Sequence, residues 1–137
     1  MVVLIVDDAK IMRTILGDIF ERFYGVDSED IHEAEGGLEA VEKFKRIKPD
    51  LVLLDIRMPD MDGVETIREI MKVDADAKVI MCTAQSEREN VRECIKLGAK
   101  DYITKPPEPD RVLEAIDKIM GTNTADTDTD ADAGAAD

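Results

Sequence analysis

The sequence predicts an α/β fold in which helices cover both faces of a doubly wound sheet of five parallel strands. Five short apolar runs alternate along the chain with five longer segments whose apolar residues recur at helical spacing. This pattern is typical of parallel strands joined by right-handed crossovers. The second and fifth runs are the most polar, which suits the edges of a sheet. The flavodoxin-like strand order 2-1-3-4-5 satisfies both observations.

The predicted strands are short runs between longer helical segments. Three of them, VVLIV at 2–6, LVLL at 51–54 and VIMC at 79–82, are apolar throughout, as is typical of strands buried on both faces. The other two, DIHEA at 30–34 and DYIT at 101–104, mix polar and apolar residues. The three apolar runs are therefore expected at the centre of the sheet.

The first two helices are expected over 11–23, ending at Gly25, and from Gly36-Gly37 to just before Pro49. A proline disfavours the helical conformation of the residue before it, so the second helix should stop there. Their spacing predicts an inward apolar face made of Ile11, Met12, Ile15, Leu16, Ile19, Phe20, Phe23, Leu38, Val41, Phe44 and Ile47.

The remaining helices are expected over 64–73, from an N-cap at Ser86 to Gly98, and over roughly 109–120. Serine is a favoured N-cap because its hydroxyl accepts a hydrogen bond from the first turn, and glycine often ends a helix. Their inward faces are predicted to hold Val64, Ile67, Ile70, Met71, Val91, Cys94, Ile95, Val112, Leu113, Ile116, Ile119 and Met120.

Composition excludes several classes of protein. The 137 residues include 32 acidic and 18 basic ones, a net charge of -14, so the chain repels nucleic-acid phosphates and anionic lipid. No apolar run is long enough to cross a membrane, and the start, MVVLIVDD, lacks a signal peptide's basic region and cleavage site. Cys82 and Cys94 fit no metal or disulfide pattern. We expect a soluble, cytoplasmic, monomeric protein with two core thiols.

The charge also divides the chain into two parts. Residues 1–120 carry all the predicted elements and form one domain. Residues 121–137, GTNTADTDTDADAGAAD, contain five Asp, no Lys or Arg and no large apolar residue. Such a segment cannot bury enough surface to offset its ordering entropy, so it is predicted to be a disordered acidic tail.

Reactive side chains cluster where the predicted strands end. Asp7 and Asp8 follow the first strand, Asp55 the third, Thr83 the fourth and Lys105 the fifth. In the predicted topology these residues share one rim, where three carboxylates repel one another. Mg²⁺ would relieve that repulsion, since it prefers oxygen ligands. A cation, an ammonium and a hydroxyl around a carboxylate also form a site for an incoming phosphoryl group.

Four segments in this order resemble the signature segments of response-regulator receiver domains. They are LIVDD at 4–8, LLDIRMPDMDG at 53–63, MCTA at 81–84 and DYITKP at 101–106. The resemblance covers residues 2–120, and by architecture the chain looks most like the CheY-type single-domain regulators. It implies the CheY-like form of the flavodoxin-like fold.

The resemblance implies roles at the rim. Asp55 matches the phospho-acceptor. Mg²⁺ would be bound by Asp8 directly, by Asp7 mostly through water, by Asp55 and by the backbone carbonyl of Arg57. Arg57 and Gln85 occupy two variable positions that tune phosphate lifetime in the family.

The resemblance also implies a switch. Thr83 matches the hydroxyl that hydrogen-bonds the phosphoryl group, and Tyr102 matches the aromatic residue whose ring turns inward when the threonine moves. Lys105 matches the phosphate-pairing lysine, held by a cis Lys105–Pro106 bond. Pro107 replaces the usual large apolar residue and alters the partner face.

The implied function is a stand-alone two-component response regulator. A histidine kinase would transfer a phosphoryl group to Asp55 in a Mg²⁺-dependent reaction, catalysed by the domain itself. Affinity for a motility switch or adaptor protein in chemotaxis would then change, and a phosphatase partner would reset it. A phosphorelay intermediate is the alternative within the family.

Two alternatives from other classes are weaker. A Mg²⁺-dependent phosphatase with an aspartyl nucleophile usually has a second acid where this chain has Arg57. A flavin-binding module would need a Ser/Thr-rich phosphate loop in place of Asp7 and Asp8.

Two other groups are expected to be structural. His32 lies on an edge strand away from the rim. Asp60, Asp62, Gly63 and Glu69 match part of a calcium-loop template, but Met58 would occupy its first ligand position. We expect these acids to belong to the loop and the helix start after the third strand.

Overall fold

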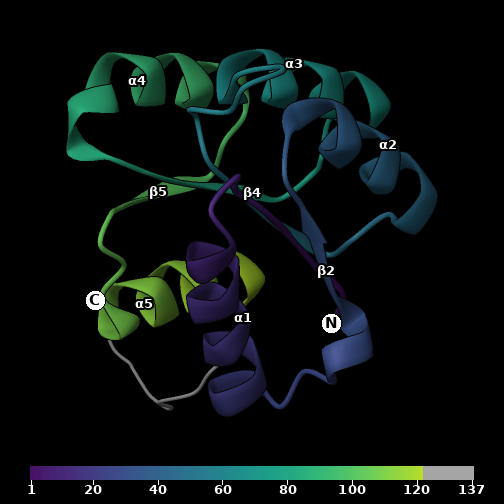
Figure 1. Ribbon diagram of the computed structural model, residues 1–137, viewed down its shortest axis with the longest axis vertical. Helices are drawn as coiled ribbons and strands as arrows, with labels where there is room; N and C mark the ends of the chain where they lie inside the picture. The colour runs from purple at the N-terminus through teal and green to yellow at the C-terminus, as the bar shows by residue number, and fades with distance from the viewer. Residues whose placement is uncertain (122–137) are drawn as a thin grey trace.

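The computed structural model describes residues 1–121, which form a five-stranded parallel sheet in the predicted order β2-β1-β3-β4-β5 (Figure 1). The strands are β1 (Val3–Val6), β2 (Ile31–Ala34), β3 (Leu51–Leu54), β4 (Val79–Thr83) and β5 (Asp101–Thr104). The predicted acidic tail lies outside the described residues from residue 122 onward. Within residues 1–121, no helix is both long and apolar enough to cross a membrane.

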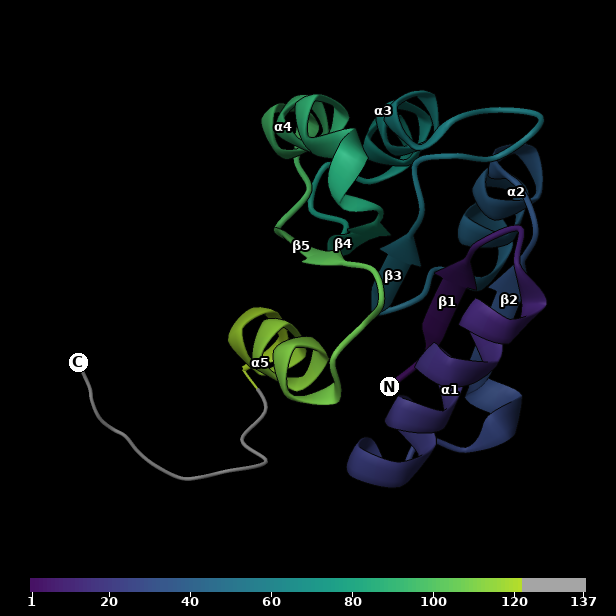
Figure 2. The same cartoon turned by 60° about the vertical axis from the view of Figure 1, so that its left-hand side comes forward.

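Helices cover both faces of the sheet, as predicted. They are α1 (Lys10–Tyr24), α2 (Gly37–Ile47), α3 (Gly63–Val73), α4 (Arg88–Leu97) and α5 (Pro109–Met120), with short 3-10 turns η1 (Ser28–Asp30) and η2 (Gln85–Glu87). In both cartoons α1 and α5 lie on one face, and α2, α3 and α4 lie on the other (Figures 1 and 2). The domain therefore has two apolar layers, one on each side of the sheet.

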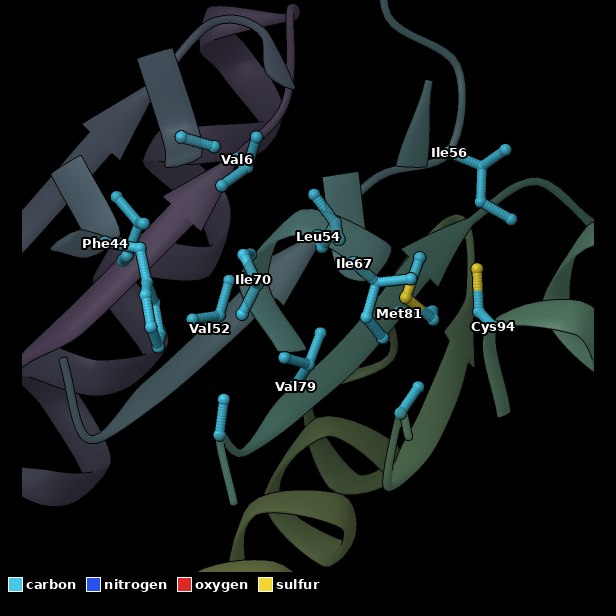
Figure 3. Packing of buried hydrophobic residues seen from close by; sticks show 14 of the residues in the cluster. Val6, Phe44, Val52, Leu54, Ile56, Ile67, Ile70, Val79, Met81 and Cys94 are labelled. Carbon is cyan, nitrogen blue, oxygen red and sulfur yellow. The ribbon is translucent and has the colours of Figure 1, made fainter. Parts of the chain in front are cut away.

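Alternating strand residues supply the two layers. Val3 and Ile5 of β1 pack with Phe20 of α1 and Ile116 of α5. On the other face, Val6, Val52, Leu54 and Met81 meet Phe44, Ile67 and Ile70 from the helices (Figure 3). Edge strand β2 is largely half-buried, whereas every residue of the three central strands is buried.

Both cysteines are core thiols, as predicted. Cys82 on β4 and Cys94 on α4 are free and buried, and they lie in different apolar layers. Burial disfavours the charged thiolate and raises the pKa of each thiol to about 12. Neither is activated for metal binding or disulfide exchange.

The predicted inward faces of α1, α2 and α4 are too wide. Ile11 and Leu38 are 70% and 58% exposed, and Ile15, Phe23 and Ile95 are also exposed. Helix α1 packs on the sheet through the narrow stripe that includes Leu16 and Phe20. Ile11 and Ile15 precede Met12 and Leu16, which pack against the core. The rotation of about 100° between successive helical residues turns Ile11 and Ile15 toward solvent.

The helix starts also differ from the prediction at one place. Ser86 is not an N-cap, because Gln85–Glu87 form a 3-10 turn and α4 begins only at Arg88. Two acids of the rejected calcium-loop template are caps instead. Asp62 accepts from the Glu65 backbone N–H at 2.9 Å and caps α3. Asp60 reaches across from the β3–α3 loop and caps α2.

Asp60 serves α2 because that helix begins at glycines without a side-chain cap of its own. Its carboxylate accepts from the backbone N–H groups of Gly37 and Leu38 at 3.0 and 3.2 Å. These are two of the donors that a helix leaves unpaired at its start. The loop that follows Asp55 is thereby attached to the neighbouring helix.

Candidate functional site

Three carboxylates meet at the carboxyl edge of the sheet, as the sequence predicts. Asp7 and Asp8 follow β1, and Asp55 follows β3; these strands are adjacent, with Val6 paired to Leu54. One oxygen from each carboxylate lies within 4.8 Å of the other two. Asp7 and Asp55 are buried, whereas Asp8 is exposed. An all-oxygen set with one open side fits a hard divalent cation such as Mg²⁺, which keeps several waters.

Lys105 joins this cluster from the loop after β5. Its Nζ lies 2.7 Å from Asp7 Oδ2 and 3.0 Å from Asp55 Oδ2. The Lys105–Pro106 bond is cis, as the resemblance implies. Burial alone would lower the lysine's pKa, but the hydrogen bonds to Asp7 and Asp55 raise it. The side chain is therefore a permanent cation between two buried carboxylates.

The backbone fixes the other oxygen of each buried carboxylate. Asp7 Oδ1 accepts from the Ala9 N–H at 2.9 Å, and Asp55 Oδ1 accepts from the Ile56 N–H at 2.7 Å. Burial raises the pKa of Asp55 above its ordinary value, although Lys105 opposes the shift. Asp55 is thus a desolvated, oriented carboxylate, which is a favourable state for a nucleophile.

Glycine at position 63 allows the loop after Asp55 to close tightly. The Gly63 N–H donates to the Ile56 carbonyl at 2.7 Å. A Cβ at Gly63 would lie 2.5 Å from the Asp55 carbonyl oxygen and 2.7 Å from Ile56 Cα. Any side chain here would push the start of α3 away from the strand end that carries Asp55.

Arg13 is a contributor that sequence reasoning missed. It lies on α1, it is buried, and its Nη1 donates to the Asp7 carbonyl at 2.7 Å. Its Nε donates to Glu33 on β2 at 2.6 Å. Arg13 therefore orients the peptide unit of Asp7. The available signal was a cation three residues before Leu16, on the inward face of the helix.

Thr83 ends β4 at the same edge of the sheet, and its hydroxyl has no partner. Its Oγ1 is the one fully buried side-chain polar atom without a hydrogen bond among residues 1–121. A buried hydroxyl without a hydrogen bond costs about 1–3 kcal/mol of stability. The Thr83 hydroxyl is therefore free to form a hydrogen bond with a group that enters the site. It lines a cavity of about 650 Å³ between α4 and β5, together with Gln85, Tyr102 and Thr104.

Tyr102 lies at the outer side of this cavity. It sits on edge strand β5, where it pairs with Met81, and it is 46% exposed. Thr83 pairs with Thr104, two residues farther along β5. The structure thus places both proposed switch residues around one cavity, with the aromatic residue on its exposed side.

Arg57 has a partner that the sequence did not indicate. Its Nε donates to Glu87, whose carboxylate is 3% exposed and also accepts from Asn90 at 2.8 Å. The hydrogen bond from Arg57 lowers the pKa of Glu87. These residues, with Asp8 and Asp62, line a second cavity of about 530 Å³. The loop after Asp55 is therefore attached to the start of α4.

Comparisons with known proteins identify the family to which the chain belongs. The family model described as the response regulator receiver domain matches residues 3–117. The chemotaxis protein CheY of Thermotoga maritima is 51% identical over 117 residues, 85% of this chain and 95% of the relative. Sporulation initiation phosphotransferase F of Bacillus subtilis is 33% identical, covering 86% of this chain and 92% of the relative.

A solved structure shares the fold. In a CheX–CheY–BeF₃–Mg²⁺ complex from Borrelia burgdorferi, the matched chain superimposes with a TM-score of 0.76 at 37% identity, over 86% of this chain and 87% of that one.

Proposed function

Since this chain belongs to the response regulator receiver domain family, we propose that it is a switch that accepts a phosphoryl group on Asp55 from a histidine kinase. Receiver domains are signalling switches and not enzymes in the ordinary sense, which argues against the phosphatase alternative. The observation that carries the proposal is the contact of Lys105 with both Asp55 and Asp7 beside the unpaired Thr83 hydroxyl.

In the proposed transfer, an Asp55 carboxylate oxygen forms a bond to the phosphorus of a phosphohistidine while the phosphorus–nitrogen bond breaks. The imidazole leaves with the electron pair and takes up a proton. Lys105 exchanges its contact with Asp55 for one with a phosphoryl oxygen, and the Thr83 hydroxyl donates to another. Asp7, Asp8, Asp55 and the Arg57 carbonyl would hold Mg²⁺, which neutralises charge on the phosphoryl oxygens.

The proposed output follows from the cavity between α4 and β5. When the Thr83 hydroxyl moves toward the phosphoryl group, space opens beside it and Tyr102 can turn inward. The face formed by α4 and β5 then changes shape, which alters affinity for a protein partner. The named relatives point to chemotaxis, with a motility switch or adaptor as the partner and a phosphatase to reset the signal. The two free, buried thiols agree with a cytoplasmic setting.

Beryllofluoride with Mg²⁺ tests the proposal, because the pair imitates a phosphoryl group on a carboxylate. We expect the backbone amide NMR signals of residues 83–104 to shift in the full chain. Asp55→Asn should abolish the shifts. Asp18→Asn makes the same change at an exposed position on α1 and should leave the shifts intact. Unchanged shifts in the Asp55→Asn variant would contradict the assignment.

A phosphorelay intermediate is the second candidate, supported by the similarity to sporulation initiation phosphotransferase F. The two functions differ in what happens to the phosphoryl group. A relay protein passes it to a second histidine protein, whereas a chemotaxis regulator binds a motility component. Capture of motility proteins that depends on beryllofluoride would favour chemotaxis, and transfer to a histidine phosphotransfer protein would favour the relay.

A further inference from the structure

The cavity between α4 and β5 has an unusual charge for this chain. Val91, Ile95 and Tyr102 supply apolar surface, and the charged residues that line it are Arg88, Arg92 and Lys96. No acidic residue lines it, although the chain has a net charge of -14. The cavity is therefore a basic groove on an acidic protein, suited to an anionic chain.

The three cations form a regular and unneutralised row. Their spacing of four residues places them along one side of α4, about 6 Å apart along the helix axis. All three are exposed, and within residues 1–121 none forms an ion pair with a carboxylate. By contrast, Arg13 forms an ion pair with Glu33, and Arg111 forms one with Asp101.

We propose that the acidic segment 122–137 of the same molecule binds in this basic groove. The segment carries aspartates at every second position from Asp126 to Asp132. In an extended chain, alternate side chains point the same way and lie about 6.6–7 Å apart. That repeat is close to the spacing of the cations on α4, so several carboxylates can pair in register. The intervening threonine and alanine side chains are small enough for close approach.

The segment starts close enough to reach the groove. Helices α4 and α5 lie on opposite faces of the sheet at the β5 edge (Figure 2), about two layers of 10 Å apart. Helix α4 leads into the start of β5, and α5 runs back from its end, so Lys96 and Gly121 lie toward the same side. Residues 122–137 can span up to about 55 Å.

The short tether makes weak pairing effective. Exposed ion pairs contribute little individually, but joining the segment to the domain through a few residues gives an effective concentration on the order of millimolar. Binding should therefore be readily reversible and sensitive to salt. An external partner of this groove would have to displace the segment. The proposal does not depend on phosphorylation of Asp55.

Paramagnetic broadening in the full chain tests the proposal. Ala135→Cys introduces a thiol for a nitroxide label, because Cys82 and Cys94 are buried and remain unreactive. We expect amide signals of residues 88–96 to broaden more than those of residues 37–47 on α2. About 1 M NaCl, where the Debye length is near 3 Å, should remove the difference.

Matched variants identify the charges responsible. Substituting Arg88, Arg92 and Lys96 by Gln should abolish the selective broadening, and so should Asn at the four alternating aspartates 126, 128, 130 and 132. Substituting Lys45, Arg46 and Lys48 by Gln removes the same charge from the last turn of α2 and the residue that follows it, and should leave the selective broadening unchanged. Selective broadening that survives the α4 substitutions, or broadening centred on another surface, would overturn the proposal.

A mixed sample distinguishes one molecule from two. Spin-labelled chain without ¹⁵N is added to ¹⁵N-labelled chain without the nitroxide. We expect no selective broadening of residues 88–96 in this mixture. Equal broadening would mean that the segment binds a second copy, and this would overturn binding within one molecule.

Discussion

The exposed guanidinium of Arg57 is paired with the buried carboxylate of Glu87. Arg57 lies two residues after Asp55, and Glu87 immediately precedes α4. The pair therefore connects the loop of the proposed phosphorylation site to the helix that lines the basic groove. Asn90 holds the second Glu87 oxygen at 2.8 Å, so the carboxylate is fixed from both sides.

A double-mutant cycle at Arg57 and Glu87 should reveal their coupling. We expect Glu87→Gln to lower the free energy of unfolding by about 1 kcal/mol, because a buried charge-assisted hydrogen bond is weakened. After Arg57→Gln, the same change should cost less, since its main partner is already gone. Urea denaturation of the four proteins measures this, and strictly additive effects would show that the pair does not contribute.

Removal of the Thr83 hydroxyl should not destabilise the unphosphorylated protein, but it should prevent the response to a phosphoryl analogue. Its buried hydroxyl is unpaired in this structure, so Thr83→Val should leave stability unchanged or raise it by up to about 1 kcal/mol. The same change should abolish the response of residues 88–104 to beryllofluoride with Mg²⁺. Thr83→Ser, which keeps the hydroxyl, is the matched control. A strongly destabilised Thr83→Val with a normal response would contradict the proposed role.

Mg²⁺ affinity should begin to fall at a higher pH than it would at a site made of exposed aspartates. Burial raises the pKa of Asp55 above the ordinary value of 3.8, so protons compete with the metal at a higher pH than for an exposed aspartate. We expect affinity to fall as pH decreases through the raised pKa, and this fall should be weaker in Asp55→Asn. Calorimetric titration with Mg²⁺ across pH measures it. An affinity that stays constant down to the ordinary aspartate range would contradict the prediction.

Asp60 should stabilise the domain through α2. Slight burial opposes ionisation, but backbone hydrogen bonds from Gly37, Leu38 and Met61 lower its pKa overall. A lowered pKa stabilises the fold above the unfolded value, and the contribution is lost as pH falls through the folded one. Asp60→Ala should therefore cost about 1 kcal/mol at neutral pH and less in acid.

Asp60→Asn is the matched control for that cap. Its amide oxygen still accepts a hydrogen bond, so we expect a smaller loss of stability without the acid dependence. Urea denaturation at neutral and acidic pH compares the three proteins. A neutral Asp60→Ala would show that the cap is energetically unimportant.

Strong local patterns account for what the sequence predicted. Three fully apolar runs and two mixed runs predict the order of the sheet. The site residues Asp7, Asp8, Asp55, Thr83 and Lys105 are predicted because each ends a strand or follows one within two residues. The structure brings the three carboxylates within 4.8 Å of one another, places Lys105 in contact with Asp7 and Asp55, and puts Thr83 at the same edge.

What the sequence missed depends on contacts between distant segments. Asp60 caps a helix that begins 23 residues earlier in the chain, and Arg57 pairs with Glu87, 30 residues later. No repeating local pattern in the sequence predicts either contact. Ile11 satisfies the helical period but faces solvent, because periodicity gives the direction of an apolar face and not its width.

The most direct measurement of the central proposal is to find the residue that carries the phosphoryl group. The full chain is incubated with acetyl phosphate and Mg²⁺, and the acyl phosphate is reduced with borohydride and mapped by mass spectrometry. We predict a single modified residue, Asp55, with no modification when Mg²⁺ is chelated. Modification of Asp7 or Asp8 instead, or of Asp55 at the same rate without Mg²⁺, would contradict the proposed site.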